Sequence, residues 1–189
     1  MWNIQGVVPP VAVGEAGHSA NRSPYLVNIV QFVKDFALSA QRIKILIGFL
    51  EYRQALYSAG ITTGFQWING SFVENVEVLA GRAPNDIDVV TFSHLCNTIP
   101  NFEDWVNQNL PLFSAPQAKA QYRVDCYWVD MDAEFNADSI ERCTYWYSMW
   151  SHQRETNLWK GFFQMNLSPE DDRRAAEYIT SLTTESNHA

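Results

Sequence analysis

The chain has 189 residues, of which 47% are hydrophobic and 14% aromatic, and its formal net charge is −8. This length and apolar content predict one folded domain with a full core, and they exclude a disordered chain. A negative field repels polyanions, and no run among the 13 Lys and Arg residues forms a basic stripe. We therefore expect no broad nucleic-acid binding.

The three cysteines show neither a CxxC motif nor a Cys/His spacing typical of a metal site, which favours reduced thiols in a reducing compartment. Residues 1–14 have no basic region followed by an apolar one, so they do not resemble a signal peptide. The longest apolar stretch, residues 43–50, contains Lys44 and is too short to cross a bilayer. These features predict a cytoplasmic protein without a membrane segment.

In chain order, residues 1–24 are rich in Pro and Gly and predict an extended N-terminal arm. Apolar residues then recur at helical spacing over 25–36. A longer helix is predicted over 40–58, with Ser39 as its N-cap and Gly60 as its stop.

The remaining segments alternate between short strand patterns and helical ones. They predict strands over 64–69, 86–92, 122–129 and 161–167, a brief helix or loop over 72–79, and helices over 102–109, from about Ser139 to His152, and from Pro169 to about Leu182. This order predicts an α/β (α+β) fold in which a small mixed β-sheet is flanked by helices. Residues 25–182 would form this single domain, and 183–189 a polar tail.

Two motifs in the segment 64–92 carry candidate chemistry. The strand over 64–69 ends in Gly70-Ser71, a tight turn whose backbone N–H groups and hydroxyl suit phosphate oxygens. Asp86 and Asp88 stand at the start of the next strand, and residues i and i+2 of a strand share a face. Two carboxylates so close favour a cation between them, and Mg²⁺ suits carboxylates combined with phosphate oxygens.

The pattern of Gly-Ser, then Asp-x-Asp, then a later strand with an acid between hydrophobic residues resembles the polymerase-β-like nucleotidyltransferase superfamily. The wider run GFQWINGSFVE…GRAPNDIDVV, followed by YRVDCYWVD and KGFF, looks like a poorly characterised branch of small bacterial proteins with that fold. The motifs cover residues 64–130, about a third of the chain. The resemblance implies the nucleotidyltransferase fold. One departure is the gap of 14 residues between Ser71 and Asp86, which is longer than in the short antitoxin-type members.

By this resemblance, Gly70 and Ser71 would hold the phosphates of a nucleoside triphosphate, and Asp86 and Asp88 would bind Mg²⁺ or Mn²⁺. The third acid, which completes the metal site and helps to activate the acceptor hydroxyl, is either Asp125 or Asp130. These two lie five residues apart, so they face opposite sides of an unbroken strand and cannot share the role. We prefer Asp125.

Two cationic residues near the C-terminal helices, Lys160 and Arg154, are further candidates for nucleotide binding. Either could neutralise a γ-phosphate or the leaving pyrophosphate. Arg82 could also approach a triphosphate, although a solvated loop arginine is the simpler interpretation.

The function expected from the resemblance is transfer of a nucleoside monophosphate from an NTP to an acceptor hydroxyl on a protein, a tRNA end or a small molecule. The alternative is a catalytically silent module of the same fold that acts through a partner protein. In both cases the resemblance suggests a toxin–antitoxin or phage-defence system. A third interpretation is a plain metal-binding or hydrolytic domain that uses the same acids.

Overall fold

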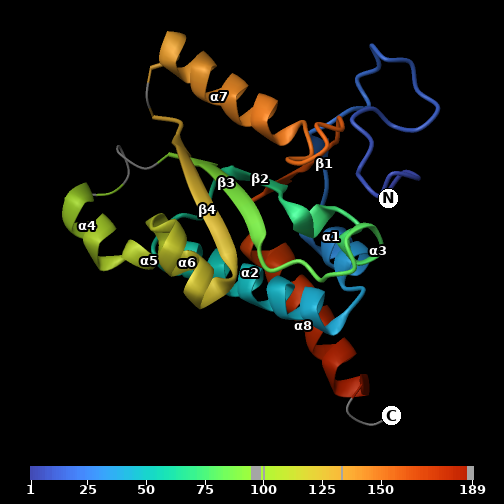
Figure 1. Ribbon diagram of the computed structural model, residues 1–189. Helices are drawn as coiled ribbons and strands as arrows, with labels where there is room; N and C mark the ends of the chain where they lie inside the picture. The colour runs from blue at the N-terminus through green and yellow to red at the C-terminus, as the bar shows by residue number, and fades with distance from the viewer. Residues whose placement is uncertain (95–98, 100, 133, 187–189) are drawn as a thin grey trace.

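A computed structural model describes residues 1–94, 99, 101–132 and 134–186, and its centre is a five-stranded mixed sheet (Figure 1). The strands lie in the order β1-β5-β2-β3-β4; β2 is antiparallel to both its neighbours, whereas β1 with β5 and β3 with β4 are parallel. Their bounds are β1 Tyr25–Leu26, β2 Phe65–Asn69, β3 Ile87–Ser93, β4 Val124–Asp130 and β5 Phe163–Asn166. The mixed sheet expected from the sequence is confirmed.

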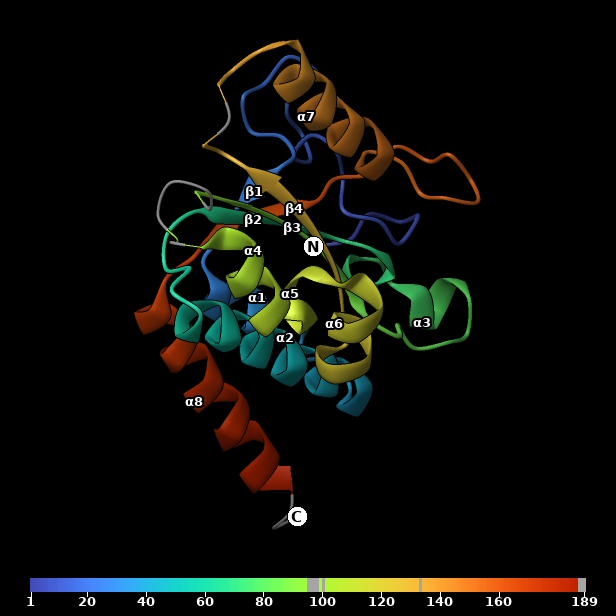
Figure 2. The same ribbon diagram turned by 90° about the vertical axis from the view of Figure 1, so that its left-hand side faces the viewer.

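Helices cover the sheet unequally. Most of them lie on one face, whereas α7 crosses the opposite face, and both views agree on this arrangement (Figures 1 and 2). The helices in the described residues are α1 Ile29–Phe36, α2 Ala40–Ser58, α3 Val76–Leu79, α4 Phe102–Gln108, α5 Leu110–Phe113, α6 Ala115–Tyr122, α7 Ala137–Trp150 and α8 Pro169–Ser186, with a 3₁₀ turn η1 at Ser71–Val73.

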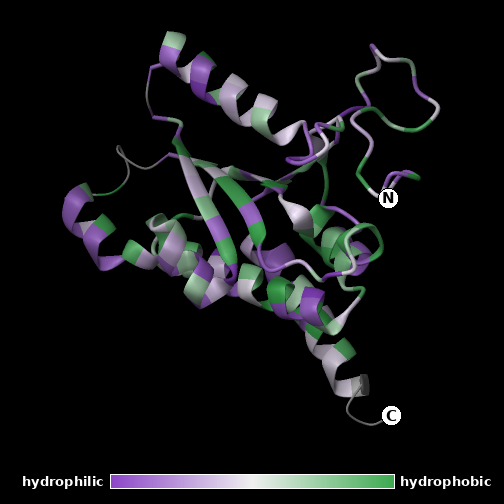
Figure 3. Ribbon diagram, viewed as in Figure 1, coloured by the Kyte–Doolittle hydropathy of each residue, from purple (hydrophilic) through white to green (hydrophobic). Residues whose placement is uncertain are grey.

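The sheet is apolar on both faces, because each face packs against a different hydrophobic core. The even-numbered β3 residues Val90 and Phe92 join a small aromatic cluster with Trp150 of α7, whereas Ile87 and Val89 join the main core beneath. In Figure 3, β3 is hydrophobic along most of its length and β4 alternates. A central strand buried on both faces is expected to read as a nearly continuous apolar run.

The second helix is confirmed with the predicted bounds. Ser39 Oγ accepts a hydrogen bond from the backbone N–H of Arg42, and Gly60 follows the helix at φ 97°. The helix predicted over 25–36 begins later, at Ile29, because Tyr25 and Leu26 pair with β5 as a short strand. Asn28 provides its N-cap.

Helices α5 and α6 were not predicted, and Tyr122, the last residue of α6, was assigned to the strand predicted over 122–129. Pro111 and Pro116 stand in the first turns of α5 and α6, where a helix has no need of the missing N–H. Arg123 ends α6 in the left-handed conformation at φ 59°, so the strand starts only at Val124.

Of the two C-terminal helices, α7 begins earlier than predicted and α8 extends further. The N-cap of α7 is Asn136, and Ser139 is the third residue of the helix, where it completes a capping box with Asn136. The start of α8 at Pro169 is confirmed, but residues 183–186 continue the helix instead of forming a tail. The hydroxyls of Thr183 and Thr184 both donate to the carbonyl of Thr180, one turn earlier in the same helix. Residues 187–189 lie outside the described residues.

The N-terminal arm packs on its own domain. Trp2 Nε1 donates to the carbonyl of Val73, and its ring lies edge-on to Phe36. Val8 is buried, and its carbonyl accepts a hydrogen bond from the N–H of Gly161. Residues 1–24 contain no helix, as predicted from their Pro and Gly content.

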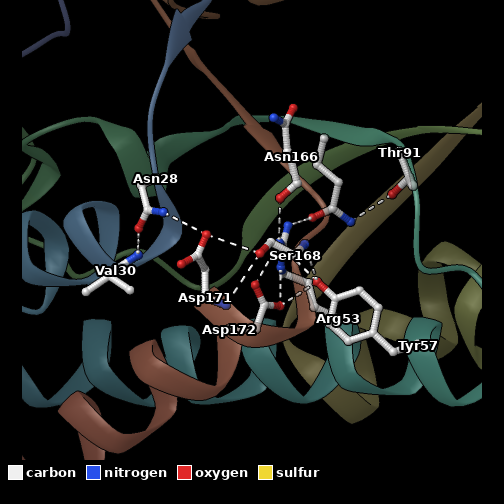
Figure 4. A network of polar contacts seen from close by, with 10 residues as sticks. Asn28, Val30, Arg53, Tyr57, Thr91, Asn166, Ser168, Asp171 and Asp172 are labelled. Carbon is white, nitrogen blue, oxygen red and sulfur yellow. Dashed lines mark hydrogen bonds and ion pairs between the residues drawn. The ribbon is translucent and has the colours of Figure 1, made fainter.

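Beneath the sheet, a buried polar network joins α2 to α8 (Figure 4). Arg53 is fully buried and forms a two-pronged ion pair with Asp172, with Nε–Oδ2 and Nη2–Oδ1 distances of 2.6 and 2.8 Å. The guanidinium also donates to Gln66 Oε1, and Gln66 donates to Thr91 Oγ1. The network therefore fixes α2 and α8 against β2 and β3.

None of the helices in the described ranges is long and apolar enough to cross a membrane. Cys126 is buried and Cys143 half-buried, and both are free thiols. Cys96 lies outside the described residues.

Candidate functional site

Three aspartates meet at one end of the sheet, on the face that α7 covers. Asp88 of β3 and Asp125 of β4 are direct partners in the parallel register, so their side chains project side by side. Asp88 shares its face with Val90, which belongs to the aromatic cluster beneath α7. Asp86 precedes Asp88 by two residues, and both it and Asp125 act electrostatically on Asp88.

Gly70 lies against this group of acids. It follows β2 at φ 84° and ψ −170°, a conformation that is essentially restricted to glycine. A Cβ atom at Gly70 would lie 2.7 Å from the Cγ of Asp88. The turn therefore brings the backbone directly onto the Asp88 carboxylate, and Ser71 follows as the first residue of η1. Thus the Gly-Ser turn and the Asp-x-Asp pair are in contact.

Asn69 contributes a buried amide to the same place. It is the antiparallel register partner of Asp88, so its side chain lies beside that carboxylate on the same face. Its Nδ2 donates to the carbonyl of Trp150 at the end of α7, with an N–O distance of 3.0 Å. Its Oδ1 is buried without a hydrogen-bond partner among the described residues. A buried acceptor without a donor is costly, and it is the type of oxygen that a cation or a bound water satisfies.

The electrostatics of the site reflect its concentration of negative charge. Burial, reinforced by the charges of Asp86 and Asp125, raises the pKa of Asp88 to about 6, although Lys160 and Lys119 act against the shift. Burial, followed by the charges of Asp125 and Asp88, raises the pKa of Tyr127 to about 12. The surroundings of Asp88 therefore strongly disfavour its negative charge, and such a site favours the binding of a cation.

Lys119 supplies one cationic partner. Its Nζ forms an ion pair with Asp86 Oδ2, and the ammonium side chain is 52% exposed whereas that of Asp86 is 13% exposed. The residue lies on α6, which connects β3 to β4 beneath the sheet. Hydrogen bonding to Asp86 raises the pKa of Lys119, so the Lys119 ammonium group stays charged at neutral pH.

Lys160 supplies the second cationic partner, but in a different setting. It precedes β5 and forms an ion pair with Glu74, and the two side chains are 5% and 8% exposed. Glu74 also accepts from Gln153 Nε2. The segment that carries Glu74 is fixed by the buried Arg42, which donates to the carbonyl of Glu74 and pairs with Glu77. The insertion between Ser71 and Asp86 is therefore anchored to α2.

The other predicted cations and the alternative acid lie elsewhere. Arg154 is exposed in the turn between α7 and β5, and Arg82 is exposed with a hydrogen bond to the carbonyl of Ala83. Asp130 pairs in register with Ser93 at the opposite end of β4 from Asp125. The prediction that Arg154 contacts phosphate stays a prediction.

A groove of about 480 Å³ opens between α2 and α5. It lies on the face of the sheet opposite α7, away from the aspartates. Glu51 is the one charged residue among its described lining residues. It does not suit an anionic ligand, so it belongs to no part of this site.

In a comparison with known protein families, the model of DUF6932, described as a family of unknown function, matches residues 1–166. The chain belongs to the DUF6932 family. Separate searches of curated proteins and of solved structures found no match. The family match spans β1 to β5 and includes every aspartate of the site. It assigns no activity to the family.

The acids are close but do not form a finished metal site. Within the described ranges, no three Asp, Glu, His or Cys side chains are arranged to hold a metal ion together. The Asp86 carboxylate is turned to Lys119. The donor set nevertheless fits a divalent cation such as Mg²⁺, since it combines carboxylates with the orphaned amide oxygen of Asn69.

Sequence reasoning did not identify Lys119, Glu74 or Asn69 as part of the site. Lys119 stands in no motif and reaches Asp86 only through the fold. Glu74 ends the run GFQWINGSFVE, but its ion pair with Lys160, 86 residues later in the chain, forms only through the fold. Asn69 directly precedes Gly70, and its position at the end of a strand was the one signal that could have found it.

Proposed function

We propose that this protein is a divalent-metal-dependent nucleotidyltransferase, which moves a nucleoside monophosphate from an NTP to an acceptor hydroxyl. The observation that carries the proposal is that Asp88 pairs in register with Asp125 while its carboxylate lies against Gly70. This arrangement joins a carboxylate cluster to a backbone turn that can receive phosphate. The resemblance of the two motifs to the polymerase-β-like superfamily supports the same activity.

In this proposal Asp86, Asp88 and Asp125 hold Mg²⁺ or Mn²⁺, with Asn69 Oδ1 as a neutral oxygen beside them. The bound cation would neutralise the triphosphate and lower the pKa of the attacking hydroxyl. Gly70 and Ser71 would orient the phosphates through their N–H groups and the Ser71 hydroxyl.

The chemical step requires a hydroxyl, an in-line phosphorus and a proton acceptor. The acceptor oxygen would bond to the α-phosphorus, and the bond from that phosphorus to the bridging oxygen would break and release pyrophosphate. Asp125 would take the hydroxyl proton and pass it to water. Lys160, held in place by Glu74, would keep a fixed positive charge near the leaving group. As in other phosphoryl transfers, positioning and charge account for most of the catalysis.

The test is thermal unfolding with each NTP and Mg²⁺, followed by transfer from an α-labelled NTP. A ligand at about 100 times its Kd adds about 2.7 kcal/mol, or about 5–10 °C for a domain of this size. We expect this rise in wild type and its loss in Asp86→Asn/Asp88→Asn and in Asp125→Asn. Asp130→Asn, at the other end of β4, is the matched control and should keep the rise. No rise with any NTP in a folded protein would count against nucleotide binding.

A second candidate function is a silent module that acts through a partner protein. One observation favours it: the outer residues of α7 include Ile140, Tyr145 and Met149, which are 50%, 57% and 44% exposed. Exposed apolar residues on one element are typical of a protein-binding surface. An Asp86→Asn/Asp88→Asn variant that still binds its partner and retains full biological function would support this alternative.

A further inference from the structure

The ion pair between Asp86 and Lys119 competes with the metal-binding role proposed for Asp86. In the structure, one carboxylate oxygen of Asp86 is occupied by the Lys119 ammonium group. Its neighbours Asp88 and Asp125 are negative, so an unpaired Asp86 would add a third charge to the cluster. Lys119 therefore acts as a counter-ion at the position where a cation is needed.

The two lysines of the site differ in how easily they can leave. Lys160 and Glu74 are both buried, so separating them would leave a charge unpaired in the interior. The Lys119 side chain is half exposed, and water can solvate its ammonium group when the pair opens. Lys160 is thus a fixed charge, and Lys119 an exchangeable one.

The backbone of Lys119 is held firmly although its side chain is half exposed. The preceding residue, Ala118, is fully buried against the core. The helix ends at Arg123, whose carbonyl accepts a hydrogen bond from the N–H of Ile87, one residue after Asp86. This contact keeps the base of Lys119 beside the acids whether or not the ion pair is closed.

We propose that Lys119 is an internal counter-ion, which holds Asp86 until a divalent cation displaces it. The inference rests on the proposed function, because it requires the aspartates to bind a metal. A bare cation must compete with Lys119 for Asp86, whereas a cation that arrives with a triphosphate also brings oxygens for the released ammonium group. Lys119 thereby selects a metal–nucleotide complex over free metal.

The test is a calorimetric Mn²⁺ titration of wild type, Lys119→Gln and Lys119→Arg without nucleotide. Removing the competing charge should tighten Mn²⁺ binding about three- to tenfold in Lys119→Gln, and high salt should reduce this gain. Lys119→Arg keeps the charge and should bind like wild type. Lys44→Gln, which removes an exposed charge from α2, should also bind like wild type.

The possible outcomes separate the two proposals. Equal Mn²⁺ affinity in all four proteins, or weaker binding by Lys119→Gln, would overturn the role of Lys119 and leave the metal site intact. No Mn²⁺ binding by any of them would overturn the metal site and the role of Lys119 together. A second readout needs no metal: in a chelator, Lys119→Gln should unfold at a lower temperature than Lys44→Gln. Equal unfolding temperatures would contradict the counter-ion role.

Discussion

The carboxylate of Asp88 rests directly against the backbone of Gly70, at a distance that no side chain larger than hydrogen allows. A Cβ atom there would meet both carboxylate oxygens of Asp88, at 2.8 and 3.0 Å. Gly60 also has a positive φ, of 97°, but a Cβ atom there would meet nothing within 4 Å. The two glycines therefore separate backbone strain from the contact with Asp88.

Gly70→Ala should destabilise the protein more than Gly60→Ala does. Both substitutions force an alanine into a positive-φ conformation, but only Gly70→Ala also displaces a half-buried carboxylate. We expect losses in the free energy of unfolding of about 2–4 kcal/mol for Gly70→Ala and about 1 kcal/mol for Gly60→Ala. Urea denaturation measures both. Equal losses would show that the contact between Gly70 and Asp88 is unimportant.

Asp88→Asn should stabilise the metal-free protein at neutral pH. Because the pKa of Asp88 is raised from 3.8 to about 6, the folded state binds this proton more tightly than the unfolded state. The stabilisation from this group is therefore complete below about pH 4 and is lost as the pH rises through about 6. In a chelator, wild type should lose about 1–3 kcal/mol relative to Asp88→Asn between about pH 4 and about pH 7.5.

Comparing the unfolding free energies of these two proteins cancels the other titrating groups. Parallel pH profiles would mean that Asp88 ionises in the folded state as it does in the unfolded chain. Saturating Mg²⁺ should remove the advantage of Asp88→Asn, since the cation binds to the folded wild type alone.

Lys160→Met should be strongly destabilising because it leaves Glu74 buried without its cation. Removing one partner of a buried ion pair costs about 3–5 kcal/mol. The double variant Glu74→Gln/Lys160→Met has no orphaned charge, so it should be more stable than Lys160→Met alone. Chemical denaturation of the two variants and wild type measures the difference. Equal stability of the single and double variants would contradict a tight pair.

The network beneath the sheet gives a prediction that does not depend on function. Asp172→Ala leaves the fully buried Arg53 without its carboxylate partner, and it should cost about 3–5 kcal/mol. The matched control is Asp171→Ala, because Asp171 is 28% exposed and bonds to Asn28 and Ser168 near the helix start. That substitution should cost about 1 kcal/mol. Thermal unfolding distinguishes the two.

Local signals were sufficient where one residue decides an element. Ser39 and Gly60 mark the start and the end of α2 as the sequence predicts, because a cap hydroxyl and a positive-φ glycine act within one turn. Local signals were insufficient for β1, since Tyr25 and Leu26 become a strand only by pairing with β5, more than a hundred residues later in the chain. They were insufficient for α5 and α6 as well, two short helices with Pro111 and Pro116 in their first turns, which the sequence analysis did not predict.

The sequence by itself determined the acidic motif, its position at the start of a strand, and the glycine turn before it. These depend on side-chain alternation and on the φ/ψ limits of single residues, which the chain carries locally. Only the tertiary structure decided that Asp125 rather than Asp130 lies beside Asp88, because that choice depends on the register of β3 with β4. The same is true of Lys119 and Glu74, since a long-range ion pair forms only where folding brings distant segments together.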